Sequence, residues 1–217
     1  MAQELTKGLF VTFEGPEGSG KSTHSKRLYK DLMDDGYDIV HTSEPGGTAL
    51  GAGIRDLLLK MDSVRLDSMT ELFLFEADRA QHVREMINPS LEANKIVLCD
   101  RFNTATFAYQ GFGLGMSMDL IEELDALATD GLRPDLTLLL DVDVETGIAR
   151  AKARGPVDRM EKRDMEFHEN VRRGYLVLAA SKTENIRMIS AGDGIDRVYD
   201  SVKKEVYGLI ERHKRAG

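Results

Sequence analysis

The stretch Gly15-Pro16-Glu17-Gly18-Ser19-Gly20-Lys21-Ser22 decides the fold of this chain. It matches the phosphate-binding pattern G-x-x-x-x-G-K-[ST] without a mismatch, and an apolar segment precedes it while a helix-forming segment, residues 21–33, follows it. Glycines let the loop N–H groups point into one concavity, where they and the helix N-terminus attract phosphate. The motif predicts nucleotide binding by Gly15, Pro16, Glu17, Gly18, Ser19, Gly20, Lys21, Ser22 and Thr23.

Apolar runs at residues 9–13, 37–40, 96–99, 136–140 and 186–189 are predicted strands. They are nearly continuous in Val, Ile, Leu and Phe rather than alternating, which is typical of strands buried on both faces. The segments between them are long enough for helices, and this β-α-β-α order favours a parallel sheet. We therefore predict an α/β chain with the P-loop NTPase fold, in which a five-stranded parallel sheet carries helices on both faces.

The composition limits the class of protein. The chain has 217 residues, 29 Lys and Arg against 37 Asp and Glu, a net charge of −8 and one cysteine, Cys99. The length suggests a single domain over residues 1–217. One cysteine excludes an intramolecular disulfide, no apolar run could span a membrane, and residues 1–7 lack the apolar stretch of a signal peptide. We expect a cytoplasmic protein that binds no membrane and, given its acidic balance, no nucleic acid.

A carboxylate at a strand end predicts the place of a metal ion. Asp100 ends the apolar run 96–99, where a Walker-B-type aspartate holds Mg²⁺. Asp141 and Asp143 end a similar run and are alternatives. We favour Asp100 because Arg101 is adjacent, which places an acid and a cation on the rim where ligands bind in open α/β sheets. Ser22 and Asp100 are thus the predicted Mg²⁺ ligands.

Two helices are readable in the rest of the chain. Residues 68–71 form a Ser-x-x-Glu capping box, and the helix they open is expected to run to about Asn88, before Pro89. Its segment 72–75 is apolar all round, which predicts cover on more than one side. Near the C-terminus an apolar stripe predicts a helix that packs on the sheet, formed by Val198, Val202, Val206, Leu209 and Ile210.

A basic segment predicts a short lid, at roughly residues 150–163. Residues 145–163 hold six cations and three anions, a local charge of +3 in an acidic protein. Arg150 and Arg154 are four residues apart and share a helix face, which Gly155 and Pro156 then end. A solvated helix face is the ordinary interpretation of such charge. However, phosphoryl transfer requires positive charge around the migrating group, and the loop supplies only Lys21.

Several motifs, taken in order, resemble the thymidylate kinase family over nearly the whole chain. They are Phe-Glu-Gly-Pro-Glu-Gly-Ser-Gly-Lys-Ser-Thr (13–23), Glu-Pro-Gly-Gly-Thr (44–48), Ala-Asp-Arg-Ala-Gln-His (77–82), Asp-Arg-Phe (100–102), Ala-Tyr-Gln-Gly (108–111), Leu-Arg-Pro-Asp-Leu (132–136) and Arg-Gly-Pro-Val-Asp-Arg (154–159). The resemblance implies a kinase that transfers the ATP γ-phosphoryl group to dTMP with Mg²⁺, giving dTDP, usually as a homodimer.

The resemblance also implies which residues contact the acceptor base. Phe75 matches the ring that stacks on thymine, although core packing would be the preferred interpretation without the resemblance. Arg79, on the same helix face, matches an arginine that contacts dTMP. Thr106 and Gln110 fall where polar contacts to the base edge are made.

Other matches concern the sugar and the phosphates. Arg101 matches the arginine that grips the acceptor phosphate, Glu17 the carboxylate that reaches the 3′-hydroxyl, and Tyr109 the ring that favours deoxyribose. The loop lacks the arginine that some members carry there, so the chain looks like the bacterial type, whose lid supplies the catalytic arginine. The implied catalytic residues are Lys21, Arg101, Arg150, Arg154 and Arg159.

Three departures and several alternatives remain at this stage. Ser43 replaces an Arg that many relatives have, Phe102 replaces Tyr, and Leu114 replaces the Arg of Gly-Arg-Gly. These three differences leave the identity of the acceptor more open than the type of reaction. A deoxynucleoside kinase would use Glu17 as a base, and another nucleoside monophosphate kinase would keep the same chemistry. A P-loop switch ATPase would have no purpose for an acceptor pocket.

Overall fold

The centre of the molecule is a parallel sheet. The computed structural model describes residues 5–61, 66–156, 158–181 and 185–216. Within these ranges five strands lie in the order β2-β3-β1-β4-β5, which confirms the predicted α/β fold. Every pairing is parallel, with Phe13 opposite Asp100, so the ends of β1 and β3 meet at one edge. The strands are β1 (Leu9–Glu14), β2 (Ile39–Ser43), β3 (Ile96–Asp100), β4 (Leu136–Asp141) and β5 (Ile186–Ser190).

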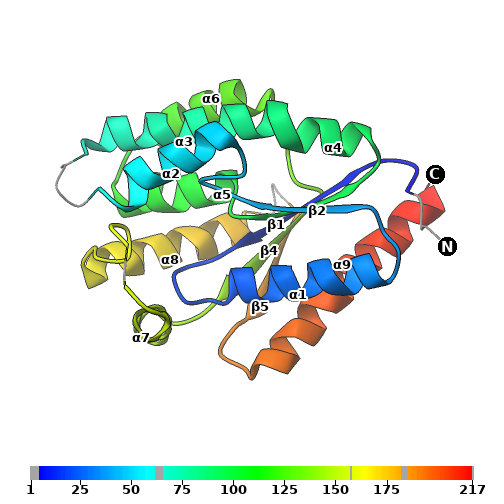
Figure 1. Ribbon diagram of the computed structural model, residues 1–217. Coiled ribbons are helices and arrows are strands. Elements are labelled where there is room, and N and C mark those ends of the chain that lie inside the picture. The colour runs from blue at the N-terminus through cyan, green and yellow to red at the C-terminus, as the bar shows by residue number, and fades with distance from the viewer. Residues whose placement is uncertain (1–4, 62–65, 157, 182–184, 217) are drawn as a thin grey trace.

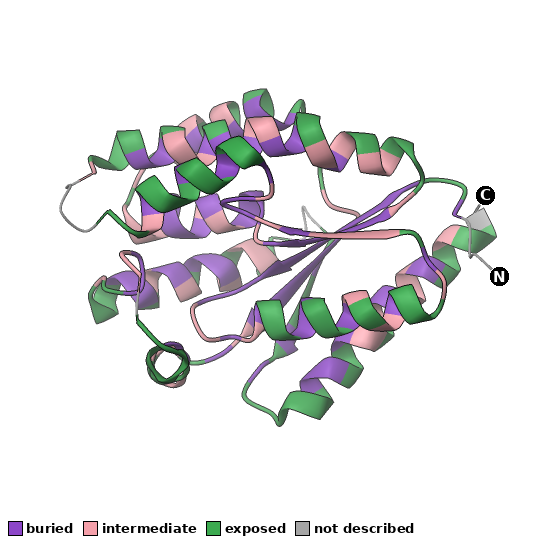
Figure 2. Ribbon diagram, in the orientation of Figure 1, coloured by how far each residue is buried: buried purple, intermediate pink, exposed green. Residues whose placement is uncertain are grey.

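Helices cover both faces of the sheet. In Figure 1, α1 (Lys21–Asp34) and α9 (Ile195–Ala216) lie on one face. The other face carries α2 (Ala49–Leu59), α3 (Ser68–His82), the π-helical segment η1 (Val83–Ile87), α4 (Asn88–Glu92), α5 (Asn103–Thr106), the π-helical segment η2 (Phe107–Gly113), α6 (Met118–Thr129) and α8 (Met165–Ala180). Buried residues concentrate in the strands and on the inward helix faces, as Figure 2 shows.

The predicted C-terminal stripe is confirmed. Val198, Val202, Val206 and Ile210 are buried and belong to one core cluster with strand residues of β1 and β4, while Leu209 packs against that cluster partly buried. The described helices include none that is long and apolar enough to cross a membrane.

The start of one strand differs from its prediction. β2 begins at Ile39, two residues after the predicted start at Tyr37, because Tyr37 still belongs to the turn that closes α1.

The helix that starts near Ser68 differs from its prediction in three ways. Its N-cap is Asp67, whose carboxylate accepts from the Met69 N–H, so the Ser68 capping box does not form. The helical path continues beyond Asn88, because the Asn88 N–H bonds to Val83 O in the π-helical register and Pro89 sits in the first turn of α4, where its missing N–H is tolerated. Cover of segment 72–75 is also incomplete, since Phe73 is 53% exposed.

The lid begins where the sequence predicted a helix end. Helix α7 (Val144–Arg154) stops at Gly155, whose φ of 144° few other residues adopt. Helix α8 then begins at Met165. Val157, inside the predicted lid, lies outside the described residues, as do residues 1–4 and 217 of the predicted single domain.

Candidate active site

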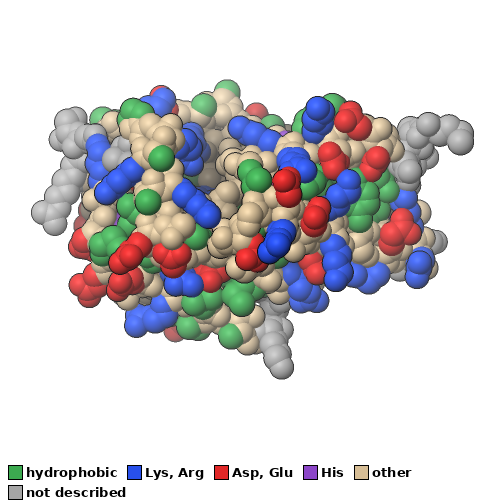
Figure 3. Space-filling view, turned by 90° about the horizontal axis from the view of Figure 1, so that it is seen from below, with side chains coloured by type: hydrophobic (Ala, Val, Ile, Leu, Met, Phe, Trp, Pro, Cys, Tyr) green, Lys and Arg blue, Asp and Glu red, His purple; other side chains and the backbone are tan. Residues whose placement is uncertain are grey.

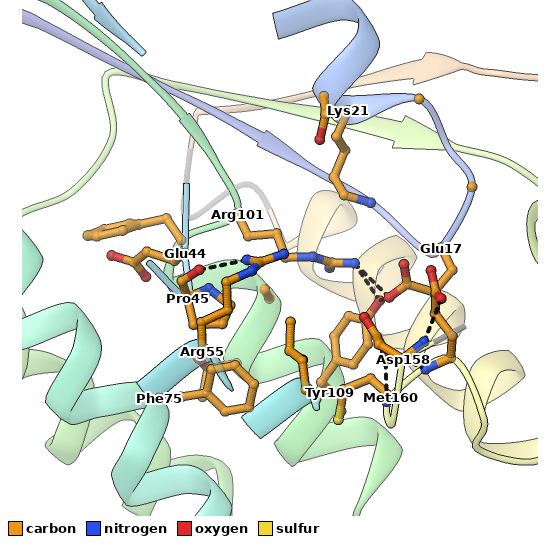
Figure 4. A pocket seen from close by; sticks show the side chains of 18 of the residues that line it. Glu17, Lys21, Glu44, Pro45, Arg55, Phe75, Arg101, Tyr109, Asp158 and Met160 are labelled. Atoms are coloured by element: carbon orange, nitrogen blue, oxygen red, sulfur yellow. Dashed lines mark hydrogen bonds and ion pairs between the residues drawn. The ribbon is translucent and has the colours of Figure 1, made fainter. Parts of the chain in front are cut away.

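A cavity of about 470 Å³ opens at the carboxyl ends of the strands. Its walls come from the P-loop, from α2 and α3, from the chain after β3, and from the lid, so segments far apart in sequence meet there (Figure 4). On the face shown in Figure 3, Lys and Arg side chains alternate with Asp and Glu over much of the surface. The cavity wall also carries both kinds of charge, and Arg101 and Glu17 form a direct ion pair there at 2.7 Å.

The P-loop holds its lysine in place through its own carbonyls. Lys21 opens α1, and its Nζ donates to Gly15 O at 2.9 Å, to Pro16 O at 2.8 Å and to Ser19 Oγ at 3.2 Å. Burial and the charge of Arg101 lower the pKa of Lys21 to about 7. An anion that binds the Lys21 Nζ in place of these carbonyls would favour the charged form of the lysine. The loop is therefore shaped for a phosphate group.

Helix α7 touches the P-loop so closely that one position requires glycine. Gly18 has a φ of 66°, and a Cβ there would lie 2.0 Å from Gly147 O. No larger residue fits without moving the backbone. The contact sets the first turn of α7 against the loop, and the lid at the other end of α7 is thus anchored beside the phosphate site.

Arg101, Glu17 and Tyr109 form one hydrogen-bonded group in the cavity. The Arg101 Nη2 donates to Glu17 Oε1 at 2.7 Å and to Tyr109 Oη at 3.0 Å, and the Tyr109 hydroxyl donates to the same Glu17 oxygen at 2.7 Å. Burial alone would raise the pKa of Glu17, but the charges of Arg101 and Lys21 outweigh it and lower that pKa to about 2. Glu17 is therefore an anchored anion and a weak base. All three predicted residues meet at the cavity.

The predicted base-contacting residues also line the cavity. Phe75 is partly buried on α3 and faces it, as Figure 4 shows. Arg79, one turn later, is only 2% exposed and pairs with Glu44 at 2.9 Å and Glu76 at 2.6 Å, which fixes its guanidinium at the cavity floor. Pairing with two acids explains why this arginine remains charged although it is buried.

Thr106 and Gln110 complete the predicted acceptor wall. Both are nearly fully buried and line the cavity. The Gln110 Nε2 donates to Glu71 Oε1 at 3.0 Å, so the side-chain amide is held in one orientation. A fixed amide can present its remaining hydrogen-bonding groups to a base edge.

Sequence reasoning missed Arg55. This residue projects from α2 toward the cavity, and its Nη1 donates to Pro45 O at 2.7 Å (Figure 4). The only signal was its place on the helix that follows Glu-Pro-Gly-Gly-Thr, two turns after the N-cap Thr48. Its position makes it a further cation of the cavity wall, in addition to Arg79 and Arg101.

Asp100 and Ser22 fit a hard divalent cation. The Asp100 Oδ1 is buried and has no partner within hydrogen-bond distance, with His41 Nε2 at 3.8 Å, so it can accept a ligand. Burial raises the pKa of Asp100, but polar contacts with His41, Ser22 and Ser25 outweigh it and keep the pKa below its ordinary value. A carboxylate and a hydroxyl at a phosphate site are oxygen donors of the kind that Mg²⁺ takes together with water and phosphate.

The three lid arginines have different surroundings. Arg154 lines the cavity, and its Nη2 pairs with Glu161 Oε1 at 2.6 Å. Arg159 turns toward α2 and α3, where it bonds to Leu58 O and to Glu71 at 2.7 Å each. Arg150 bonds to Ala191 O at 2.9 Å, beyond β5. Of the three, only Arg154 is placed against the cavity, and the catalytic part of each stays a prediction.

The three departures from the family pattern have clear surroundings. Ser43 ends β2 beside Asp100. Phe102 is fully buried, with its ring 4.9 Å from that of Phe10, so no hydroxyl is needed in that apolar cluster. Leu114 packs partly buried against the cluster that contains Tyr109.

The comparisons with known proteins agree with one another. The thymidylate kinase family model matches residues 13–202. A thymidylate kinase from an Exiguobacterium species is 48% identical over 97% of this chain and 98% of that protein, and one from Pseudomonas putida is 44% identical over 94% and 98%. The crystal structure of thymidylate kinase from Ehrlichia chaffeensis superposes with a TM-score of 0.77 at 37% identity, covering 93% of this chain and 99% of that one.

Proposed function

The chain belongs to the thymidylate kinase family and phosphorylates dTMP, and from that premise we propose that Mg-ATP is its phosphoryl donor and that the cavity binds dTMP beside it. One observation carries the proposal. The P-loop lysine and the Arg101–Glu17–Tyr109 group share one cavity, so a donor phosphate on the loop would face an acceptor held by that group. The product would be dTDP.

The geometry supports catalysis by alignment and charge rather than by a base. The acceptor phosphate is already ionised near neutral pH, since the second pKa of a monoester is about 6. Arg101 and Arg55 would hold that phosphate from two sides of the cavity. Lys21 would neutralise the charge of the migrating group, and Arg154 would approach it from the lid. Closure of the lid on both substrates would exclude water.

Mg²⁺ would be held by Ser22 and Asp100. The Asp100 Oδ1, which has no hydrogen bond, and the nearby Ser22 hydroxyl would supply the protein ligands, and phosphate oxygens and water would complete the shell. The ion itself would neutralise charge on the donor phosphates. Asp100 also ends the strand beside the P-loop strand, so its carboxylate is fixed relative to the loop.

The ion pair between Glu17 and Arg101 favours a nucleoside monophosphate over a nucleoside as the acceptor. A deoxynucleoside kinase accepts phosphate on a hydroxyl and benefits from a carboxylate base. With a pKa of about 2 and an ion pair to Arg101, Glu17 suits the binding of a sugar hydroxyl better than the removal of its proton. A switch ATPase is disfavoured by the acceptor cavity itself.

A substrate panel tests the proposed function. Purified protein with Mg-ATP is given dTMP, dUMP, dCMP, dGMP or thymidine, and ADP formation is followed, with an arm that lacks an acceptor. We expect turnover with dTMP and none with thymidine. Hydrolysis of ATP at the same rate without any acceptor would overturn the proposal in favour of a switch ATPase.

Replacing Phe75 with alanine should raise KM for dTMP about 5- to 150-fold and leave KM for ATP nearly unchanged. Stacking of a base on an aromatic ring is worth roughly 1–3 kcal/mol, and Phe75 is the partly buried ring that α3 presents to the cavity. Steady-state kinetics with each substrate varied in turn gives both values. Unchanged dTMP affinity together with a lower Tm would show that the ring only packs the core.

A homodimer is part of the same proposal. Three helices that lie side by side, α2, α3 and α6, expose large apolar side chains, namely Leu50 at 55%, Leu57 at 42%, Phe73 at 53% and Leu127 at 73%. Such a surface is costly in water and is typical of an interface. We assign the covering of this surface to a second copy of the chain.

The cysteine content bears on the compartment. With one buried, free cysteine, Cys99, the protein would act in the cytoplasm.

Replacing Phe73 with glutamate should convert the dimer to a monomer. A charge on the apolar surface would be buried without a partner on association. Sedimentation velocity measures the mass, and Ile195→Glu is the matched control, because that residue is 56% exposed on α9 at the opposite face. A wild-type protein that sediments as a monomer at all concentrations would contradict the assignment.

A further inference from the structure

Arg101 holds an unusual backbone conformation. Its φ of 68° lies in the left-handed region, which costs free energy for any residue with a Cβ. Such a conformation persists only where neighbouring contacts determine it. The Arg101 N–H donates to Phe13 O at 2.9 Å, which continues the β1–β3 ladder by one residue and holds the amino side of Arg101.

The peptide group that follows Arg101 is held from both sides. Its carbonyl, Arg101 O, accepts from the Cys99 Sγ at 3.0 Å. Its N–H, on Phe102, donates to Glu14 Oε1 at 2.8 Å, and the Ala105 N–H reaches the same oxygen at 3.3 Å. Glu14 therefore fixes the turn after β3 and also caps the short helix α5, whose N-cap residue Phe102 offers no side-chain acceptor.

Glu14 also reaches the guanidinium of Arg101 through one tyrosine. The Tyr175 hydroxyl, on α8, donates to Glu14 Oε2 at 3.0 Å and accepts from Arg101 Nη1 at 3.3 Å. Both Glu14 and Tyr175 are at most 1% exposed, and neither borders the cavity. One carboxylate thus bonds to the main chain after Arg101 and, through Tyr175, steadies the far end of the same side chain.

We propose that Glu14, together with Tyr175, is a positioning residue that sets both the backbone and the guanidinium of Arg101 for the acceptor phosphate. The inference rests on the proposed role of Arg101. Neither residue would touch substrate. Glu14 at the end of β1 and Glu17 in the P-loop then have different roles: Glu17 contacts Arg101 inside the cavity, and Glu14 orients Arg101 from outside the cavity.

The hydrogen bonds around Glu14 explain how a buried strand accommodates an acid. Glu14 is fully buried at the end of β1, where burial raises its pKa to about 7 although Arg101 lies near. A buried carboxylate is costly unless hydrogen-bond donors surround it. Three donors surround Glu14: the Phe102 and Ala105 N–H groups from the chain after β3, and the Tyr175 hydroxyl from α8.

The test compares Tyr175→Phe with Tyr199→Phe. Tyr199 is the matched control, because it is also a buried tyrosine that donates to a carboxylate on another helix, Asp31 at 2.7 Å, but it lies on α9 outside the acceptor site. For Tyr175→Phe we expect Kd and KM for dTMP to rise about 5- to 30-fold, with KM for ATP within about twofold. Tyr199→Phe should lower Tm to a similar extent and change neither constant.

Glu14→Gln is the second variant. Glutamine keeps an oxygen for the Phe102 N–H but presents an amide to Tyr175, so an effect on dTMP affinity of the same kind as that of Tyr175→Phe is expected. Equal dTMP affinity in wild-type protein, Glu14→Gln and Tyr175→Phe would overturn the inference, as would an equal loss in Tyr199→Phe. Arg101→Ala distinguishes failure of the proposed role of Arg101 from failure of the positioning by Glu14. If Arg101→Ala also binds dTMP normally, the proposed role of Arg101 is wrong. If Arg101→Ala binds dTMP weakly while Glu14→Gln and Tyr175→Phe bind it normally, only the positioning by Glu14 is wrong.

Discussion

Replacing Lys21 with alanine should lower kcat by at least about 10²–10³-fold while the protein remains folded, because loss of one preorganised donor at a developing charge has an effect of that size. Lys21 is the cation that the P-loop carbonyls hold in place, where the proposed donor phosphates would bind, and Arg101 and Arg154 reach the cavity from other sides. Neither Arg101 nor Arg154 can occupy the space that the Lys21 side chain fills inside the loop.

The fold of Lys21→Ala should survive because the buried ammonium is itself costly. Burial lowers the Lys21 pKa from 10.5 to about 7, so the folded protein binds fewer protons than the unfolded chain between those values. Folding stability therefore rises with pH across this window in wild-type protein, and the substitution should flatten that rise. Single-turnover rates and thermal unfolding from pH 6 to 10 measure both effects.

An exposed lysine of the same helix provides the control. Lys30 lies on α1 away from the cavity, so Lys30→Ala should keep wild-type turnover and the wild-type dependence of Tm on pH. Turnover close to wild type in folded Lys21→Ala would contradict the assignment of the P-loop as the donor site.

Much of the fold was predictable from local patterns. The central strands β1, β3 and β4 are continuous apolar runs because both of their faces are covered, whereas the edge strands β2 and β5 are partly exposed. The P-loop lies between a strand and a helix, as its phosphate-binding geometry demands. The family resemblance supplied the acceptor residues, and Phe75, Arg79 and Tyr109 do line one cavity. The π-helical register around Val83–Ile87 left no signal, because it depends on how the helix packs and not on local propensity.

The roles of several site residues could not be predicted, because they depend on which distant residues their long side chains contact. Arg159 and Arg154 look equivalent in the sequence, yet Arg159 bonds to the buried Glu71 on α3 and Arg154 faces the cavity. Glu14 gave no signal either, since a carboxylate at a strand end is interpretable only when the chain after β3 is known to fold back onto it. Contacts across more than 80 residues of sequence decide these roles.

The different surroundings of Arg154 and Arg159 predict different roles for these two lid residues. Arg154 has a side chain that is 67% exposed, and within the described part of the chain it hydrogen bonds to Glu161, at the cavity wall. A doubly or triply charged phosphate would compete well with one carboxylate for this guanidinium, whose planar fork can bridge two oxygens. Arg159, by contrast, joins the lid to α2 and α3, so its loss should lower Tm and lid order more than it affects the transferring group.

Replacing Arg154 with alanine should therefore lower kcat by about 10- to 10³-fold and leave the Kd values of ATP and dTMP within about threefold, because the contact is made mainly in the transition state. Glu161 holds the arginine before the substrates arrive, so ground-state binding gains little from it. Single-turnover rates and isothermal titration with a non-hydrolysable ATP analogue give the two quantities. Lys152→Ala is the control, since it removes a neighbouring exposed cation from α7 without touching the cavity wall. An equal fall in kcat for both variants would mean that the lid acts through its net charge, and wild-type rates for Arg154→Ala would place the catalytic cation outside the lid.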